Sequence, residues 1–206
     1  MKNLNISLFV VSTAVSLFGC SHSDHTAKVP EVESFPLIRE REDTRPPMQF
    51  NIDKTYRLEF GRGSGWHGLD TIKIDDSNQV TLHRLREENG VLHWEHTEVD
   101  LTASDKQEIG QLIVDLGIPK MKRSYHADVH DGTQWIFWIV QNGHEKSIYF
   151  NNHFPKEIQS FALAIDEKLK DAGIEEVQWR RVPDDQERQH EKAIWKSIKN
   201  KPNQPE

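Results

Sequence analysis

The residues best suited to chemistry form a short alternating cluster of histidine and aspartate. His126, Asp128 and His130 are separated by single residues, and in an extended strand this spacing points all three side chains to one face. Two imidazoles and a carboxylate are a ligand set that zinc accepts, with a fourth position left for water. One hypothesis is therefore a metal-dependent hydrolase in which the ion activates water. The alternative is a solvent-facing strand edge, because Asp131-Gly132 is typical of a turn.

Two further pairs of residues are candidates for binding. Asn89-Gly90 favours a type I′ hairpin turn, and pairing outward from it sets His83 opposite His96. Such a pair could bind a metal ion or act as a pH-responsive contact. The alternative is that both histidines lie on a solvent-exposed sheet surface. Trp66 and His67 lie in a glycine-rich loop, where an aromatic ring is a candidate for exposure and for contact with a partner.

Recognised catalytic signatures do not accompany these candidates. The glycine-rich loop lacks the Gly-Lys-Ser/Thr ending of a P-loop, and Ser64 within it is not part of a Gly-x-Ser-x-Gly motif. The His-Glu steps at His144 and His190 are not followed by the second histidine of a zincin helix. We therefore expect no cofactor and favour a non-enzymatic binding or accessory protein over the hydrolase.

The overall charge argues against nucleic acid as a partner. The chain has 33 acidic and 26 basic residues and a formal net charge of -7. Nucleic-acid binding draws its affinity from clustered lysine and arginine, so a chain with this balance is not expected to bind it.

The first twenty residues have the layout of an export signal. A charged end at Lys2 is followed by an apolar stretch over residues 4–18, and Gly19-Cys20 closes the stretch. The ending from Leu17 to Cys20 resembles the lipobox of bacterial lipoproteins, and this resemblance covers residues 1–20 only. It implies that residues 1–19 are removed as a signal peptide and that Cys20 receives the lipid.

The resemblance also implies a location in the cell. Ser21 follows the cysteine where lipoproteins kept at the inner membrane of enteric bacteria tend to have aspartate, so an outer-membrane lipoprotein facing the periplasm is expected. Cys20 is the only cysteine, and its lipidation leaves no thiol for catalysis, metal binding or a disulfide. The expected partners are the membrane, through the lipid, and possible envelope proteins or cell-wall components; the oligomeric state stays open.

The mature chain divides into a tether, one domain and a tail. Residues 20–50 are rich in proline and charge, which predicts a tether. Residues 51–180 carry the strand and helix patterns of one globular domain, and residues 181–206 form a charged tail. Three apolar residues of this tail stand at helical spacing and predict a marginal terminal helix, docked or free: Ile194, Trp195 and Ile198.

Alternation and turn signals predict the strands. Strands are expected at Tyr56–Phe60 and Leu69–Ile74, and hairpins are expected around Asn89-Gly90 and Asn142-Gly143. Residues 135–140 are apolar on both faces, which indicates a central strand covered on both sides or a sheet whose second face meets something else. The expected registers pair Val80 with Val99, Arg84 with Glu95, Leu85 with Trp94, Trp135 with Phe150, Ile136 with Tyr149 and Phe137 with Ile148.

Two helices complete the predicted domain. Thr102 and Asp105 imitate a capping box at the start of the first helix, and Gly117 ends it. The second helix begins at Pro155 and stops at Gly173. Each helix has one apolar stripe that can pack against a sheet. The order of strands, helix, strands and helix therefore predicts an α+β fold, an antiparallel sheet of hairpins with two helices packed on one face.

Overall fold

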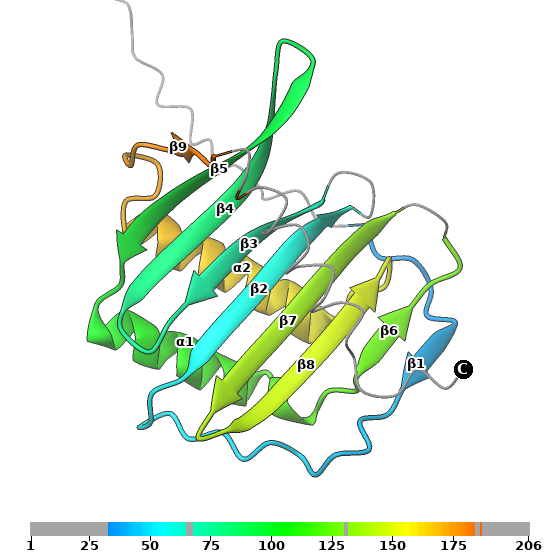
Figure 1. Cartoon of the computed structure of the whole chain (residues 1–206). Helices are drawn as coiled ribbons and strands as arrows, with labels where there is room; N and C mark the ends of the chain where they lie inside the picture. The colour runs from blue at the N-terminus through cyan, green and yellow to red at the C-terminus, as the bar shows by residue number, and fades with distance from the viewer. Residues whose placement is uncertain (1–32, 65–67, 130–131, 184–185, 187–206) are drawn as a thin grey trace, which may run out of the picture. The chain divides into compact units, whose positions relative to one another are not determined.

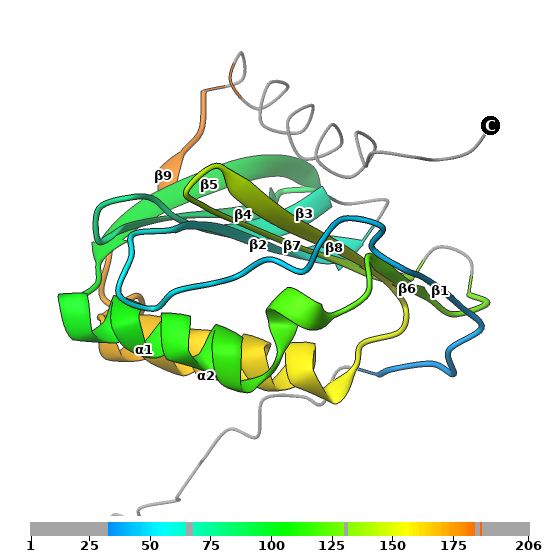
Figure 2. The same cartoon turned by 90° about the horizontal axis from the view of Figure 1, so that it is seen from below.

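The computed structural model describes residues 33–64, 68–129, 132–183 and 186. Within these residues, one nine-stranded sheet has the order β1-β6-β8-β7-β2-β3-β4-β5-β9. Two helices lie against one face of this sheet (Figure 1 and, from below, Figure 2). The α+β class with both helices on one face is therefore confirmed. We call the face that carries the helices the helix face and the opposite one the second face.

The element bounds follow the predicted order. The helices are α1 (Ala103–Asp115) and α2 (Lys156–Asp171), and the short 3₁₀ helix η1 (Ile118–Lys120) follows α1. The strands are β1 (Arg39–Arg41), β2 (Arg57–Ser64), β3 (Gly68–Ile74), β4 (Gln79–Glu88), β5 (Val91–Asp100), β6 (Ser124–His126), β7 (Thr133–Gln141), β8 (His144–Asn151) and β9 (Arg180–Arg181).

Both predicted hairpins have the expected registers. In the β4–β5 hairpin the φ angles of Asn89 and Gly90 are 52° and 78°, and in the β7–β8 hairpin those of Asn142 and Gly143 are 52° and 77°. Positive φ at both central residues is what a type I′ turn requires. The turns place the residue pairs opposite each other as the sequence predicted, from Val80 with Val99 to Phe137 with Ile148.

The helix boundaries are also confirmed. At the start of α1, Thr102 Oγ1 accepts a hydrogen bond from Asp105 N at 3.1 Å, and Asp105 Oδ2 accepts one from Thr102 N at 3.1 Å, which is the reciprocal capping box. Gly117 beyond α1 has a φ of 66° and Gly173 beyond α2 has a φ of 83°. Pro155 immediately precedes α2. None of the described helices is long and apolar enough to cross a membrane.

The main core lies between the helices and the helix face. Phe161 of α2 meets Phe60 of β2 and Phe137 of β7 edge-on, with ring centroids 5.4 and 5.3 Å apart. All three side chains are fully buried. Edge-to-face contacts of this kind add to the free energy gained by burying the rings, so this cluster holds α2 on the centre of the sheet.

The domain begins earlier than the sequence predicted. The expected tether ran to residue 50, yet β1 pairs with β6 and Met48 is buried in the main core. This N-terminal segment is attached with few apolar residues, because backbone pairing and one ion cluster hold it on the domain. The correction is that the folded domain includes residues 39–50. At the other end, β9 pairs with β5 and Val182 is buried, so the domain also passes residue 180.

A buried ion cluster attaches the N-terminal segment to β8. Lys146 Nζ donates to Asp43 Oδ2 at 3.0 Å and also to the carbonyl of Met121, beyond η1. Arg45 Nε donates to Asp43 Oδ1 at 2.9 Å. Partial burial acts to raise the pKa of Asp43, but the hydrogen bonds from Arg45 and Lys146 outweigh it and leave that pKa well below its usual range.

Candidate functional site

The predicted cluster at His126 lies only partly within the described residues. β6 ends at His126, and Asp128 is exposed beyond the strand, so the alternation that would align the side chains stops too early. His130 lies outside the described residues. Among the residues that the structure describes, no group of three or more histidine, cysteine, aspartate or glutamate side chains is placed to hold a metal ion. His126 instead meets the ring of Tyr149, with centroids 5.6 Å apart.

The predicted histidine pair is present on the second face. His83 of β4 lies opposite His96 of β5, with ring centroids 6.0 Å apart and an angle of 22° between the planes. Burial lowers the pKa of His83 to about 4, and the charges of Lys73 and His96 act in the same direction. His83 is therefore neutral at pH 7, where it can both donate and accept a hydrogen bond.

The strand registers join this pair to a line of residues that crosses the whole sheet. Residues directly opposite each other on neighbouring strands share a face, so the pairings can be followed from one edge to the other. The resulting line, which we call the central row, takes one residue from each strand on the second face: Arg41, Ser124, Tyr149, Ile136, Gly61, Thr71, His83, His96 and Arg180.

The middle of the central row is closely packed. A Cβ placed on Gly61 would lie 2.8 Å from Ile136 Cγ1 and 3.4 Å from Thr71 Cγ2. Glycine at this position therefore lets the two neighbouring side chains lie over the β2 backbone. Ile136 belongs to a small apolar cluster of the second face, whose fully buried members are Leu69, Trp94, Ile136 and Val182.

Among the residues that the structure describes, two polar atoms near the middle of the row have no hydrogen-bond partner. They are Thr71 Oγ1 and, beside the row on β7, Gln134 Oε1, and both atoms are buried. A buried polar atom without a partner costs free energy. The two atoms are hydrogen-bonding groups that a bound polar molecule or segment could use.

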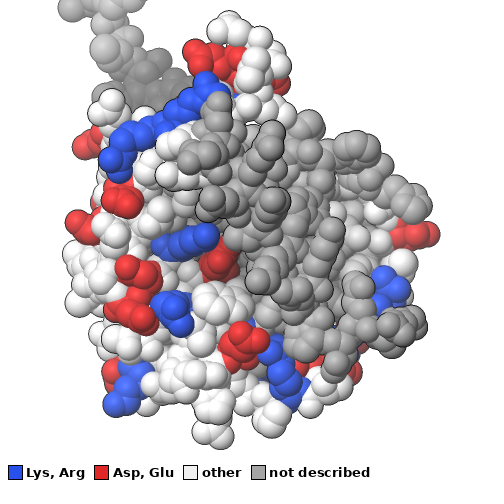
Figure 3. Space-filling model, viewed as in Figure 1, with Lys and Arg blue, Asp and Glu red and all other residues white. Residues whose placement is uncertain are grey.

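Charges of both signs surround the row. On the coloured part of this face in Figure 3, Lys and Arg side chains lie among Asp and Glu side chains, apart from one short run of Lys and Arg at the upper left. Lys73 Nζ, for example, lies 3.9 Å from Glu59 Oε1. An extended basic surface for phosphates is therefore not present in this view.

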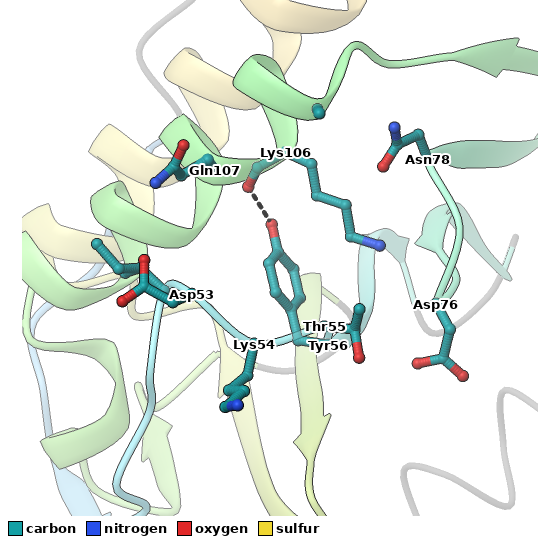
Figure 4. Close-up of a pocket in the computed structure, with 10 residues that line it drawn as sticks. Asp53, Lys54, Thr55, Tyr56, Asp76, Asn78, Lys106 and Gln107 are labelled. Carbon is teal, nitrogen blue, oxygen red and sulfur yellow. Dashed lines mark hydrogen bonds between the residues drawn. The ribbon is translucent and has the colours of Figure 1, made fainter.

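A cavity of about 370 Å³ lies elsewhere, between α1, the start of β2 and the β3–β4 turn (Figure 4). Lys106 of α1 is buried and points toward the turn. Lys106 Nζ donates to the carbonyls of Asp75, at 2.6 Å, and Ser77. Tyr56 Oη donates to the carbonyl of Lys106 at 2.7 Å.

The groups in this cavity join structural elements. Burial lowers the pKa of Lys106, and its side-chain nitrogen donates hydrogen bonds to two backbone carbonyls. Burial likewise raises the pKa of Tyr56 and keeps its hydroxyl protonated. Lys106 and Tyr56 therefore tie α1 to the β3–β4 turn and to β2, and the cavity is a weaker candidate than the second face.

Four of the predicted site residues lie outside the described residues. They are His130, Cys20 and the loop pair Trp66 and His67. Sequence reasoning found His83 and His96 but missed Thr71 and Ile136 as members of the same site. Alternation within β3 and β7 gives each residue its face, but the alignment of these strands with β4 depends on the strand order of the sheet.

Comparison of the sequence with models of known protein families finds no match, and comparison with curated proteins finds no match either. What the second face can do therefore follows from its own side chains.

Proposed function

We propose that the chain is a lipid-anchored lipoprotein of the bacterial envelope, whose domain is a non-enzymatic module that binds another envelope component through the second face. The anchor is supported by the lipobox-like ending at Cys20. The binding role is supported by the central row, where buried hydrogen-bonding groups and apolar side chains share one side of the sheet.

The shape of this face favours binding over chemistry. The row is laid out across a sheet, and nine strands at about 4.8 Å spacing extend over roughly 38 Å. Protein partners are recognised on surfaces of such dimensions, with aromatic and apolar residues at the centre and polar residues around them.

The metal-dependent alternative has no comparable support. It required His126, Asp128 and His130 on one strand face, and the described strand ends at the first of the three. Elemental analysis of the purified chain still provides a direct test. About one equivalent of zinc, lost in the His126→Ala variant, would favour the hydrolase.

The anchor is tested by replacing Cys20 with alanine. Wild-type cells grown with labelled fatty acid are expected to yield labelled protein in the outer-membrane fraction, because several acyl chains at about 0.8 kcal/mol per buried methylene hold a protein on the bilayer. The Cys20→Ala variant is expected to carry no label. Ser21→Ala is the matched control, and it keeps the thiol. Equal labelling of the Cys20→Ala variant and the wild type would remove the anchor from the proposal.

The binding role is tested with a photo-reactive amino acid placed on either face of the domain. Trp138 is on the second face beside the row, and Leu163 is exposed on α2 on the other side of the domain. In intact cells we expect covalent adducts of higher mass from position 138 and not from position 163. The same adducts from both positions, or none from position 138, would contradict binding through the second face.

A further inference from the structure

Two aliphatic side chains just before β1 are exposed although their backbone is held in place. Leu37 is 40% exposed and Ile38 is 61% exposed. Ile38 N donates to the carbonyl of His126 at 2.9 Å, and Phe35 N donates to the carbonyl of Asn152 at 2.9 Å. These hydrogen bonds fix the stretch along the edge of the sheet. The fold therefore holds two apolar side chains in solvent, where contact with a further apolar layer would gain free energy.

Basic side chains lie on the same edge. Arg39 and Arg41 belong to β1, and Arg123 N donates to the carbonyl of Arg41 at 2.8 Å. Among the described residues, none of these three guanidinium groups forms an ion pair with a carboxylate. Partial burial lowers the pKa of Arg123, and the charges of Arg45 and Arg41 lower it further. The charge of Asp43 acts in the opposite direction but does not outweigh them. An anion beside these side chains would relieve the crowding of like charges.

The acidic residues of this edge already have a partner. Glu40 and Glu42 both form ion pairs with Lys122, the second with 2.7 Å between Lys122 Nζ and Glu42 Oε1. We call residues 37–42, together with Lys122 and Arg123, the β1 edge. Four of its charged side chains are basic and two are acidic, in a chain whose formal net charge is -7. The β1 edge is therefore positive although the protein as a whole is acidic.

We propose that the β1 edge rests on the surface of an anionic lipid bilayer, with Leu37 and Ile38 in the interfacial layer and the arginines beside the lipid phosphates. Exposed aliphatic side chains next to basic ones are a combination that binds proteins to such a surface. Burial of the aliphatic groups and attraction to anionic lipid act together there, and each arginine near the surface adds to the binding.

The sequence connects this edge closely to the proposed lipid. Thirteen residues lead from Cys20 to Glu33, the first described residue, and a chain of that length spans at most about 45 Å. Lipid on Cys20 would therefore keep the β1 edge at a high effective concentration near the bilayer. Contacts too weak to recruit a free protein are then sufficient to orient an anchored one. In this respect the inference rests on the proposed function.

This contact would also leave the second face open for a partner. β1 is at one edge of the sheet, and β5 and β9 are at the other (Figure 1). β5 is seven strand spacings from β1, which is about 34 Å. With β1 on the bilayer, the strands are stacked away from the membrane and the second face stands upright beside it.

The experiment measures contact between position 38 and lipid. Residues 21–206 contain every described residue, and this chain has no cysteine of its own. An N-terminal hexahistidine tag binds it to vesicles that contain a nickel-chelating lipid, so the tag takes the place of the acyl chains. Ile38→Cys carries a bimane dye, and nitroxide-labelled lipid in the vesicles quenches the dye where the two meet.

In vesicles with about 30% phosphatidylglycerol, we expect the nitroxide lipid to lower the bimane fluorescence at position 38 at least about twofold. Val91→Cys is the matched control, because Val91 is 58% exposed and lies at the start of β5, across the sheet. Its dye is expected to stay unquenched. Vesicles of phosphatidylcholine with the chelating lipid hold the same amount of protein through the tag, and they are expected to leave position 38 largely unquenched as well.

Two double variants test the contribution of the charges. Arg39→Gln with Arg41→Gln is expected to lower the quenching at position 38 toward that in neutral vesicles, because both cations of β1 are removed. Arg57→Gln with Arg86→Gln removes the same net charge at exposed positions of β2 and β4. This second variant is expected to leave the quenching unchanged.

Three results would overturn the inference. They are equal quenching at positions 38 and 91, equal quenching at position 38 in neutral and anionic vesicles, and equal effects of the two double variants. A bimane spectrum at position 38 that changes with protein concentration in the absence of vesicles would assign the β1 edge to a second copy of the chain and would also overturn it. Because the tag replaces the lipid, none of these results depends on Cys20. Loss of the anchor from the proposed function would show in the fatty-acid labelling alone.

Discussion

The helix face and the second face use the same strands but very different side chains. On β2 and β7, the helix face presents Phe60 and Phe137, which are fully buried under Phe161. At the adjacent positions of the same two strands, the second face presents Gly61 and Ile136. Because side chains alternate along a strand, one sequence can build a large aromatic core on one side and a flat, partly polar surface on the other.

This difference separates stability from recognition. Burial of large rings supplies most of the favourable free energy of folding, and the helix face contains nearly all of them. The second face can then keep Thr71 Oγ1 and Gln134 Oε1 without hydrogen-bond partners, at a cost that the main core offsets. We therefore expect substitutions on the helix face to change the free energy of unfolding most, and those on the second face to change binding as well.

The largest expected effect is on the helix face. Phe161→Ala removes a fully buried ring that meets Phe60 and Phe137 edge-on. Truncation of a buried phenylalanine costs about 3–5 kcal/mol, because both the transfer free energy and the packing are lost. The free energy of unfolding from urea titration checks this. A loss below about 1 kcal/mol would show that α2 is not held by this cluster.

The next largest expected effect is on the ion cluster of Asp43, Arg45 and Lys146, which attaches the N-terminal segment to β8. Asp43→Ala leaves Lys146 buried with only a carbonyl partner, and we expect a loss of about 3 kcal/mol at pH 7, the low end for breaking a buried pair. Since the folded state lowers the pKa of Asp43 from 3.8, its stabilisation is present above that value and is lost as the pH falls toward the lower, folded pKa.

The difference between wild type and Asp43→Ala should therefore narrow in urea titrations below about pH 4. Asp128→Ala, at an exposed aspartate, is the matched control and is expected to change the free energy of unfolding by less than about 0.5 kcal/mol. A difference for Asp43→Ala that stays constant into acid would contradict the proposed ion pairing.

On the second face, a substitution at Gly61 tests how closely the central row is packed. Gly61→Ala places a methyl group 2.8 Å from Ile136 Cγ1, and overpacking of this kind costs about 1–3 kcal/mol. Combining it with Ile136→Ala should cost less than the sum of the two single changes, because the clash disappears. Strict additivity in the double-mutant cycle would mean that the two residues are not in contact.

The smallest expected effect is that of pH on the histidine pair. The folded state lowers the pKa of His83 from 6.5 to about 4, so the unfolded chain takes up a proton first and stability falls as the pH drops from about 6.5 toward 4. Between pH 7 and pH 5 we expect His83 to account for a loss of about 1 kcal/mol, after allowing for its partial exposure.

His83→Gln should remove this part of the pH dependence in urea titrations at pH 7, 6 and 5. His144→Gln, at an exposed histidine of the β7–β8 turn, is expected to leave the wild-type dependence in place. If both variants behave like the wild type, His83 is more accessible to protons than the structure indicates.

Local signals in the sequence predicted much of this architecture. Asn89-Gly90 and Asn142-Gly143 gave two hairpins with their registers, and Thr102 with Asp105 gave the start of α1. These features depend on residues close together in the chain, so the sequence determines them directly. His83 and His96 were found for the same reason, because one hairpin places them opposite each other.

Contacts between distant segments were not predictable in this way. The parallel pairing of β6 with β8, and the attachment of Asp43 to Lys146, join residues from different parts of the chain that carry no local signal. The alternation of His126 and Asp128 left a metal site and a solvent-facing strand edge as alternatives, and no local signal showed that β6 ends at His126.

By itself, the sequence determined the α+β class, the hairpin registers and the helix caps, and it predicts a lipid site at Cys20. Only the tertiary structure decided which strands are neighbours, and that order places Thr71 between Gly61 and His83 on one face. The physical reason is that turns and caps are set by backbone geometry within a few residues, whereas strand order depends on which buried surfaces fit together across the whole domain.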